Sequence, residues 1–172
     1  MGKLIDNRYR VIQRIGRGGM GSVDLAEDMR LDRKVAIKRL QLIAHPDDLD
    51  IFYKRFEREA KVMAGFQHPS IVSVFDYGQD DEGVYLVLEY MPKGSLADAM
   101  RKRRFTIQEA IEVLLPLMEA LQAIHQQGNV HRDLKPGNIL FDKYGNPKLA
   151  DFGVVKLLQG QDMTFTPTGA AV

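Results

Sequence analysis

A glycine-rich segment near the start of the chain, GRGGMGSVDLAED at residues 16–28, restricts the possible folds most strongly. Gly16, Gly18 and Gly21 form the pattern G-x-G-x-x-G, which occurs in two kinds of nucleotide site. In one kind the glycines open a helix that binds a dinucleotide, and in the other they lie between two strands above the phosphates of ATP. Here the last glycine is followed by Ser-Val-Asp-Leu-Ala, whose alternation predicts a strand. The dinucleotide alternative is therefore disfavoured.

The first half of the chain predicts a small sheet with one helix. Alternating apolar residues indicate five strands, over residues 8–15, 23–26, 34–40, 71–77 and 84–90. Between the third and fourth strands, Phe52, Phe56 and Met63 recur at helical spacing and predict a helix over about residues 47–65, ended by Gly65. We expect these elements to form an α+β lobe.

The second half of the chain changes to a helical pattern after the linker MPKGS. Ser95 with Asp98, and Thr106 with Glu109, form the S/T-x-x-D/E pattern that starts helices. The second pair opens a long amphipathic helix, in which Pro116 is expected to cause a kink. The segments ILFD and KLAD flank KYGNP and predict a short hairpin.

Composition excludes several classes of function. The net charge of +1 gives no general attraction to nucleic acid or to anionic membranes, and the absence of cysteine excludes disulfides and thiol chemistry. The basic run at residues 101–104 fits a solvated helix end better than a docking site. Without an apolar leader or an apolar run long enough to cross a bilayer, the chain is expected to be soluble and cytoplasmic.

Four motifs follow one another along the chain. The glycine-rich segment precedes Lys38 in VAIK, then HRDLKPGN at residues 131–138, and then DFG at residues 151–153. Together they resemble the eukaryotic-like Ser/Thr protein kinases of bacteria, from about Tyr9 to the last residue. The resemblance implies a two-lobe fold, with a five-stranded N-lobe carrying one helix in residues 1–90. An incomplete helical C-lobe would follow in residues 91–172, because the sequence stops within the activation segment of that family.

The resemblance implies that ATP binds beneath the glycine-rich segment, where glycines let backbone N–H groups approach the phosphates. Taken alone, these glycines also fit an ordinary hairpin turn. The backbones of Glu89 and Met91 would bond the adenine edge, and Leu88 before them would be the gatekeeper. The residues expected to contact ATP are Ile15, Gly16, Arg17, Gly18, Gly19, Met20, Gly21, Ser22, Val23, Ala36, Lys38, Glu89, Met91 and Leu140.

Lys38 would hold the α- and β-phosphates and pair with a glutamate of the predicted helix, as the resemblance implies. Glu59 shares a helical face with Phe56 and Met63, so we expect it to point inward. Glu57 lies off that face and is expected to be solvated.

The HRDLKPGN and DFG motifs would supply the other catalytic groups. By resemblance, Asp133 would orient the substrate hydroxyl and accept its proton, and Lys135 would neutralise charge on the transferred phosphoryl group. Asn138 and Asp151 would each hold a magnesium ion. His131 is expected to be structural.

Threonines near the end of the sequence resemble the activation loop of bacterial kinases. Thr166 and Thr168 match an autophosphorylated T-x-T-G pair, and Thr164 is a weaker candidate. Arg132, before the catalytic aspartate, is typical of kinases regulated by such phosphorylation. The alternative is a polar tail without this role.

The resemblance implies an ATP-dependent kinase that phosphorylates Ser and Thr in protein substrates, with no nucleic-acid partner and with a homodimer as one option. Such a kinase is either free in the cytoplasm or the cytoplasmic domain of a membrane-anchored protein. The rival hypothesis is a truncated, catalytically silent module that binds nucleotide or regulates another kinase.

Two further expectations concern exposure. With so few C-lobe helices, apolar residues such as Leu114, Leu121 and Ile124 are expected to stay partly exposed. Asp24 replaces the aromatic residue that commonly follows the valine of the glycine-rich segment, and it is expected to point to solvent.

Overall fold

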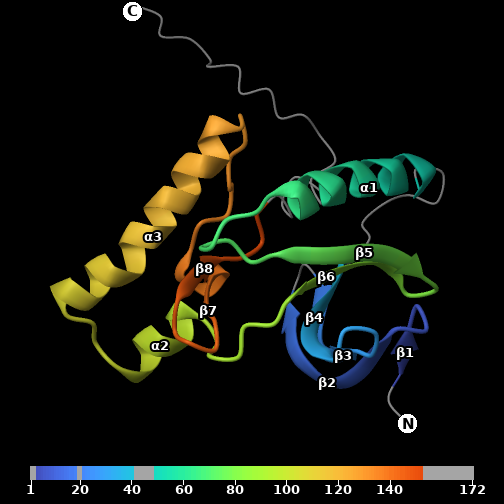
Figure 1. Ribbon diagram of the computed structural model, residues 1–172, viewed down its shortest axis with the longest axis horizontal. Helices are drawn as coiled ribbons and strands as arrows, with labels where there is room; N and C mark the ends of the chain where they lie inside the picture. The colour runs from blue at the N-terminus through green and yellow to red at the C-terminus, as the bar shows by residue number, and fades with distance from the viewer. Residues whose placement is uncertain (1–2, 19–20, 41–48, 153–172) are drawn as a thin grey trace, which may run out of the picture.

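The computed structural model describes residues 3–18, 21–40 and 49–152. A curled antiparallel sheet with one long helix forms one part, and two further helices with a short hairpin form the other (Figure 1). The α+β architecture with a partial helical lobe, predicted from the sequence, is confirmed.

The sheet has six strands in the order β1-β2-β3-β4-β6-β5. Their bounds are β1 Leu4–Ile5, β2 Tyr9–Gly18, β3 Gly21–Asp28, β4 Arg33–Leu40, β5 Val74–Asp80 and β6 Gly83–Glu89. Strand β1 was not among the five predicted strands, because two residues are too short to show an alternating pattern.

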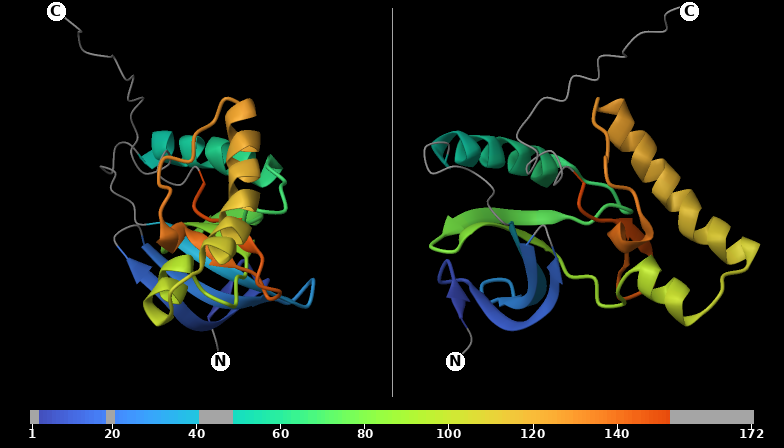
Figure 2. Two further views of the ribbon diagram at one scale, coloured as in Figure 1. Left: turned by 90° about the vertical axis from the view of Figure 1, so that its left-hand side faces the viewer. Right: turned by 180° about the vertical axis from the view of Figure 1, so that it is seen from behind.

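Both faces of the sheet are covered. Every residue of β4 from Val35 to Leu40 is buried, including Lys38 and Arg39, so side chains on both faces of this strand are covered. On one face, α1 (Leu49–Gly65) packs Phe56 and Met63 against the sheet. On the other, β1 closes a smaller core around Tyr9. Both views in Figure 2 show α1 lying along one side of the curled sheet.

The helical part begins with α2 (Leu96–Lys102) and α3 (Ile107–Gln126). Both predicted start signals form complete capping boxes, with Ser95 and Thr106 as the N-caps. Helix α3 runs through Pro116 and ends before Gly128, whose φ of +72° suits glycine.

One face of α3 is apolar and exposed. Leu117, Ala120 and Ile124 are buried in the main core. The prediction of partial exposure is therefore wrong for Ile124, confirmed for Leu114 and confirmed for the half-buried Leu121. The large apolar side chains exposed on α3 are Ile107, Ile111, Leu114, Leu115 and Met118.

The C-terminal hairpin joins the two parts of the fold. It consists of β7 (Ile139–Phe141) and β8 (Pro147–Leu149), preceded by the 3-10 turn η2 (Pro136–Asn138). The N–H of Val72 donates to the carbonyl of Leu149, and the N–H of Leu149 donates to the carbonyl of Ser70, both at 2.8 Å. Residues 71–72, predicted to begin a strand of the main sheet, therefore bind β8 instead, and β5 starts later.

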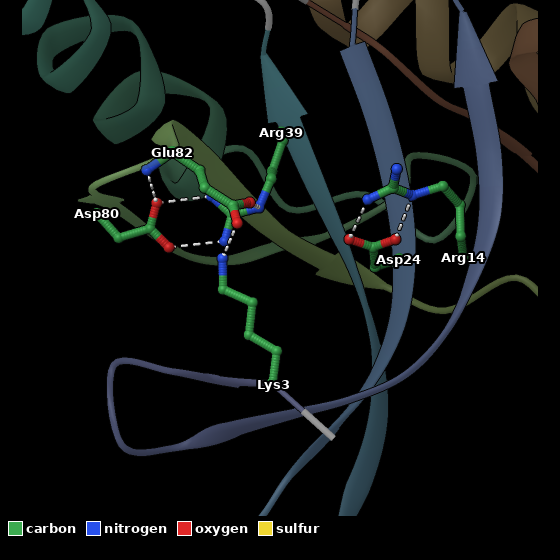
Figure 3. Close-up of polar contacts among 6 residues, drawn as sticks. All are labelled: Lys3, Arg14, Asp24, Arg39, Asp80 and Glu82. Atoms are coloured by element: carbon green, nitrogen blue, oxygen red, sulfur yellow. Dashed lines mark hydrogen bonds and ion pairs between the residues drawn. The ribbon is translucent and has the colours of Figure 1, made fainter. Parts of the chain in front are cut away.

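Asp24 does not point to solvent, so this expectation is wrong. The side chain lies on the same face of the sheet as Ile37 and Arg39, and the residue is only 5% exposed. Its carboxylate is bound by the guanidinium of Arg14 on β2 (Figure 3).

Among the helices of the described ranges, none combines the length and the apolar character needed to cross a membrane.

Candidate nucleotide and catalytic site

A cavity of about 470 Å³ lies where the sheet meets the helical part. The strands β2 and β3 form one wall, and residues 88–95, η2 and β7 contribute to the others. Ten residues expected to bind ATP or metal line it: Ile15, Gly16, Val23, Ala36, Lys38, Glu89, Met91, Asn138, Leu140 and Asp151. The predicted gatekeeper Leu88 also lines the cavity.

Other residues of the glycine-rich segment lie beyond the cavity wall. Arg17 pairs with Ser22, and Gly18 with Gly21, at the tip of the β2–β3 hairpin. Gly21 has a φ of +129°, a conformation that favours glycine. Gly19, Met20 and the candidate phosphorylation sites Thr164, Thr166 and Thr168 lie outside the described residues.

Packing within the protein does not explain the glycines at positions 16 and 18. A Cβ atom at Gly16 would make only an ordinary contact of 3.6 Å with Val23, and one at Gly18 would meet nothing within 4 Å. The space that side chains would fill there is left open, which is the arrangement that backbone groups need to approach a phosphate.

Glu89, whose backbone is predicted to bond the adenine edge, has its side chain bound by β8. The ammonium of Lys148 on β8 lies 2.8 Å from both carboxylate oxygens of Glu89. The N–H of Glu89 donates to the carbonyl of Ser73. Because the carboxylate and the N–H are already bound, the backbone carbonyl is the group of Glu89 left for a contact with adenine.

Lys38 is buried and forms an ion pair inside the cavity. Its ammonium lies 2.5 Å from the Asp151 carboxylate, and the residue is 7% exposed. A buried ammonium requires such a partner. Within the described residues this partner is Asp151, and not Glu59 as expected.

Glu59 is buried on the inward face of α1, as its helical position predicted. It lines a small separate cavity of about 90 Å³ together with Arg132 and Phe152. Glu57 is exposed and pairs with Lys61 at the surface.

Asp133 is held as an ionised carboxylate. It accepts a hydrogen bond from the Lys135 ammonium at 2.7 Å and another from the Asn138 amide at 2.8 Å. Chiefly through Lys135, these partners keep the pKa of Asp133 below its ordinary value. The carboxylate is therefore charged and oriented at neutral pH.

His131 is buried behind this loop. Its Nε2 lies 2.9 Å from the carbonyl of Ala150, and its Nδ1 accepts a hydrogen bond from the N–H of Asp133. This pattern requires the neutral ring with the proton on Nε2. Burial lowers the pKa of His131, in agreement with that form. The contacts fit the expected structural role.

Two residues next to the site adopt left-handed backbone conformations. Arg132 has a φ of +67° and Asp151 a φ of +62°, which costs about 1 kcal/mol for residues other than glycine. Each directly follows one partner of the bond between His131 and Ala150. That bond therefore holds the backbone immediately before Arg132 and immediately before Asp151.

The oxygen donors of the site suit a magnesium ion. The amide nitrogen of Asn138 is bound to Asp133, so its amide oxygen remains for a cation. Asp151 adds a carboxylate to the same cavity. Magnesium at nucleotide sites is usually held by one or two carboxylates together with the phosphates, and this donor set fits that pattern.

Several residues of the cavity were not predicted: Val72, Tyr90, Pro92, Gly94, Ser95, Asp98, Gly137 and Ala150. Ser95 and Asp98 were identified only as a helix start, and their position shortly after Glu89 and Met91 was the available signal. Val72 reaches the cavity because its segment pairs with β8, which no local pattern reveals.

Comparison with known proteins gives a consistent result. The family described as "Protein kinase domain" matches residues 9–170. The serine/threonine-protein kinase PrkC of Bacillus subtilis is 40% identical over 167 residues, which cover 96% of this chain and 26% of that protein. The serine/threonine-protein kinase PknB of Mycobacterium tuberculosis is 37% identical over 175 residues, which cover 98% of this chain and 27% of that protein. The chain thus spans about a quarter of the length of these relatives.

Proposed function

We propose, because the chain belongs to the protein kinase family, that the whole protein is a kinase that transfers the γ-phosphoryl group of ATP to Ser and Thr hydroxyls of proteins. The observation that carries this proposal is the single cavity shared by Lys38, Asn138 and Asp151, with Asp133 bonded to one of them. The cavity thereby brings together a cation for the phosphates (Lys38) and oxygen ligands for a metal (Asn138 and Asp151). The carboxylate of Asp133, which suits the substrate hydroxyl, is bonded to Asn138.

The shape of the cavity supports ATP as the nucleotide. A volume of about 470 Å³ is in the usual range for small-molecule sites. Ile15, Val23 and Ala36 can cover one face of the adenine, and Leu140 can cover the other. At the other end, Lys38 offers a cation beside glycines without side-chain bulk.

The ion pair between Lys38 and Asp151 supports a role for both residues in binding. Its two charges match the two charged parts of the ligand, since an ammonium suits the phosphates and a carboxylate suits the metal. Magnesium bound there would neutralise charge on the phosphate oxygens. We infer that Lys38 is then released to the phosphates and to its expected partner Glu59.

Asp133 and Lys135 suit the transfer step. A carboxylate with a lowered pKa is a weak base, and it can still orient a hydroxyl and accept its proton late in a loose, dissociative transition state. Lys135, already beside it, can neutralise charge on the transferred group. Autophosphorylation of Thr166 or Thr168 is proposed from the sequence pattern alone, as are a cytoplasmic location and a homodimer.

Intact mass after incubation with Mg-ATP tests the proposal, using the full-length protein and an Asp133→Asn variant. We expect phosphate on the wild type. In the variant we expect at least about a 100-fold slower gain with nucleotide affinity retained, since only the transfer step loses a group. Asp81→Asn, an exposed change in the turn between β5 and β6, is the control and should behave as wild type.

Two outcomes would contradict the proposal. Undiminished phosphorylation in Asp133→Asn would show that this residue is not the catalytic base. Nucleotide binding by the wild type without any phosphate transfer would favour the silent binding module instead.

A further inference from the structure

Ion pairs cluster on the face of the sheet opposite the nucleotide cavity (Figure 3). Lys3 pairs with Glu82, Arg39 binds Asp80 through two hydrogen bonds of 2.7 and 2.6 Å, and Arg39 also contacts Glu82. The remaining pair, between Arg14 and Asp24, lies on the strands that carry the glycine-rich segment.

The Arg14–Asp24 pair has a two-point geometry. The Nε of Arg14 lies 2.9 Å from one carboxylate oxygen of Asp24, and a terminal nitrogen lies 3.4 Å from the other. Asp24 is buried, whereas the side chain of Arg14 is half-exposed. A buried carboxylate needs a cation, and Arg39 is already held by Asp80. Arg14 is therefore the cation that binds the Asp24 carboxylate directly, while Arg39 acts on it only through its charge.

This pair lies directly beside an irregularity in the β2–β3 ladder. Arg14 is opposite Asp24 and Gly16 is opposite Val23, so Ile15 has no direct partner. Such a bulge bends a strand and redirects the next side chain. Here it lets the adjacent residues Ile15 and Gly16 both line the nucleotide cavity, whereas in an unbroken strand they would lie on opposite faces.

We propose that Arg14 and Asp24 are positioning residues for the nucleotide site: their ion pair fixes the bulge at Ile15 and thereby holds Ile15, Gly16 and Val23 over the nucleotide. A slip of β2 by one residue would turn Arg14 away from Asp24 and leave a buried charge uncompensated. Loss of the ion pair thus raises the free energy of the shifted register, in which Ile15 would leave the cavity. This inference rests on the proposed nucleotide function.

Steady-state kinetics of the full-length protein with Mg-ATP test the inference, using Asp24→Asn, Arg14→Gln and the double variant. We expect KM for ATP to rise about fivefold and kcat to change by less than about twofold, because the loss concerns ATP binding and not phosphoryl transfer. The double variant should be no worse than either single variant, since both remove the same pair. Without nucleotide, amide exchange at Ile15, Gly16 and Val23 should become faster.

The matched control is the pair of Arg10 with Glu27, which joins the same two strands at their other end and is solvent-exposed. Arg10→Gln and Glu27→Gln should leave KM and these exchange rates unchanged. A lowered Tm in Asp24→Asn and Arg14→Gln with an unchanged KM would overturn the inference, because the pair would then serve stability alone. Failure of the wild type to bind a fluorescent ATP analogue would overturn both this inference and the proposed function.

Discussion

The ammonium of Lys38 and the carboxylate of Asp151 lie 2.5 Å apart, so that β4 is tied to the segment after β8 across the nucleotide cavity. Two motifs far apart in the sequence thus form one charged pair. Lys38 is expected to bind the phosphates of Mg-ATP, and Asp151 is expected to bind the metal. Substitution of either residue therefore tests its role in binding.

Lys38→Met is expected to reduce phosphoryl transfer by at least about 100-fold, because the phosphates lose their buried cation. The measurement is kcat/KM of the full-length protein. Lys34→Met changes an exposed lysine on the same face of β4 and should have little effect. Equal losses in the two variants would argue against a specific role for Lys38.

Stability is expected to fall as the pH drops from 7 to 5, in part through His131. Burial lowers the pKa of His131 in the folded state. In the unfolded chain the histidine has its ordinary pKa of about 6.5 and takes up a proton near that pH. The unfolded state therefore binds more protons below that pH. Denaturant unfolding at several pH values should show a steeper loss in the wild type than in His131→Gln. Parallel curves would contradict this contribution.

Arg8→Ala is expected to cost about 3 kcal/mol of unfolding free energy, because it leaves a buried carboxylate largely uncompensated. Asp28 is fully buried and is bound by Arg8 at 2.8 and 2.7 Å. The comparison is Lys61→Ala, which removes the solvent-exposed pair with Glu57 and should change stability far less than Arg8→Ala does. Similar costs for the two substitutions, measured by urea unfolding, would refute the distinction.

Residues 1–172 on their own are expected to self-associate through the exposed apolar face of α3. Ile111→Lys combined with Met118→Lys should shift sedimentation velocity profiles toward monomer. Gln108→Lys combined with Gln122→Lys adds the same charge at exposed polar positions of the helix and should not. If both pairs act alike, net charge and not the apolar face controls association.

Signals that span only a few residues predicted the structure well. The capping boxes at Ser95 and Thr106 form as expected, because their partners lie three residues away. The inward position of Glu59 followed from its helical spacing. The alternating patterns identified five of the six strands.

Features that depend on a distant segment were not predictable in this way. Val72 leaves the main sheet for β8, a pairing visible only in three dimensions. Asp24, expected to point to solvent, is buried instead, because its partner Arg14 lies on the neighbouring strand beside a bulge. The pairing of Lys38 with Asp151 instead of Glu59 likewise depends on how the loop after β8 is placed.

Two of the contacts that join the two parts of the fold are made by the cavity-lining residues Val72 and Glu89. One is the backbone pairing of Val72 with Leu149, and the other is the ion pair of Glu89 with Lys148. We expect the parts to rotate mainly about the line that joins these two contacts. Spin labels at the exposed positions Leu31 and Met100 can measure this rotation, and a distance that never varies would exclude it. Such a pivot would widen the cavity at the glycine-rich end while the adenine end keeps its shape, so that the triphosphate end of the ligand would be the first to be freed.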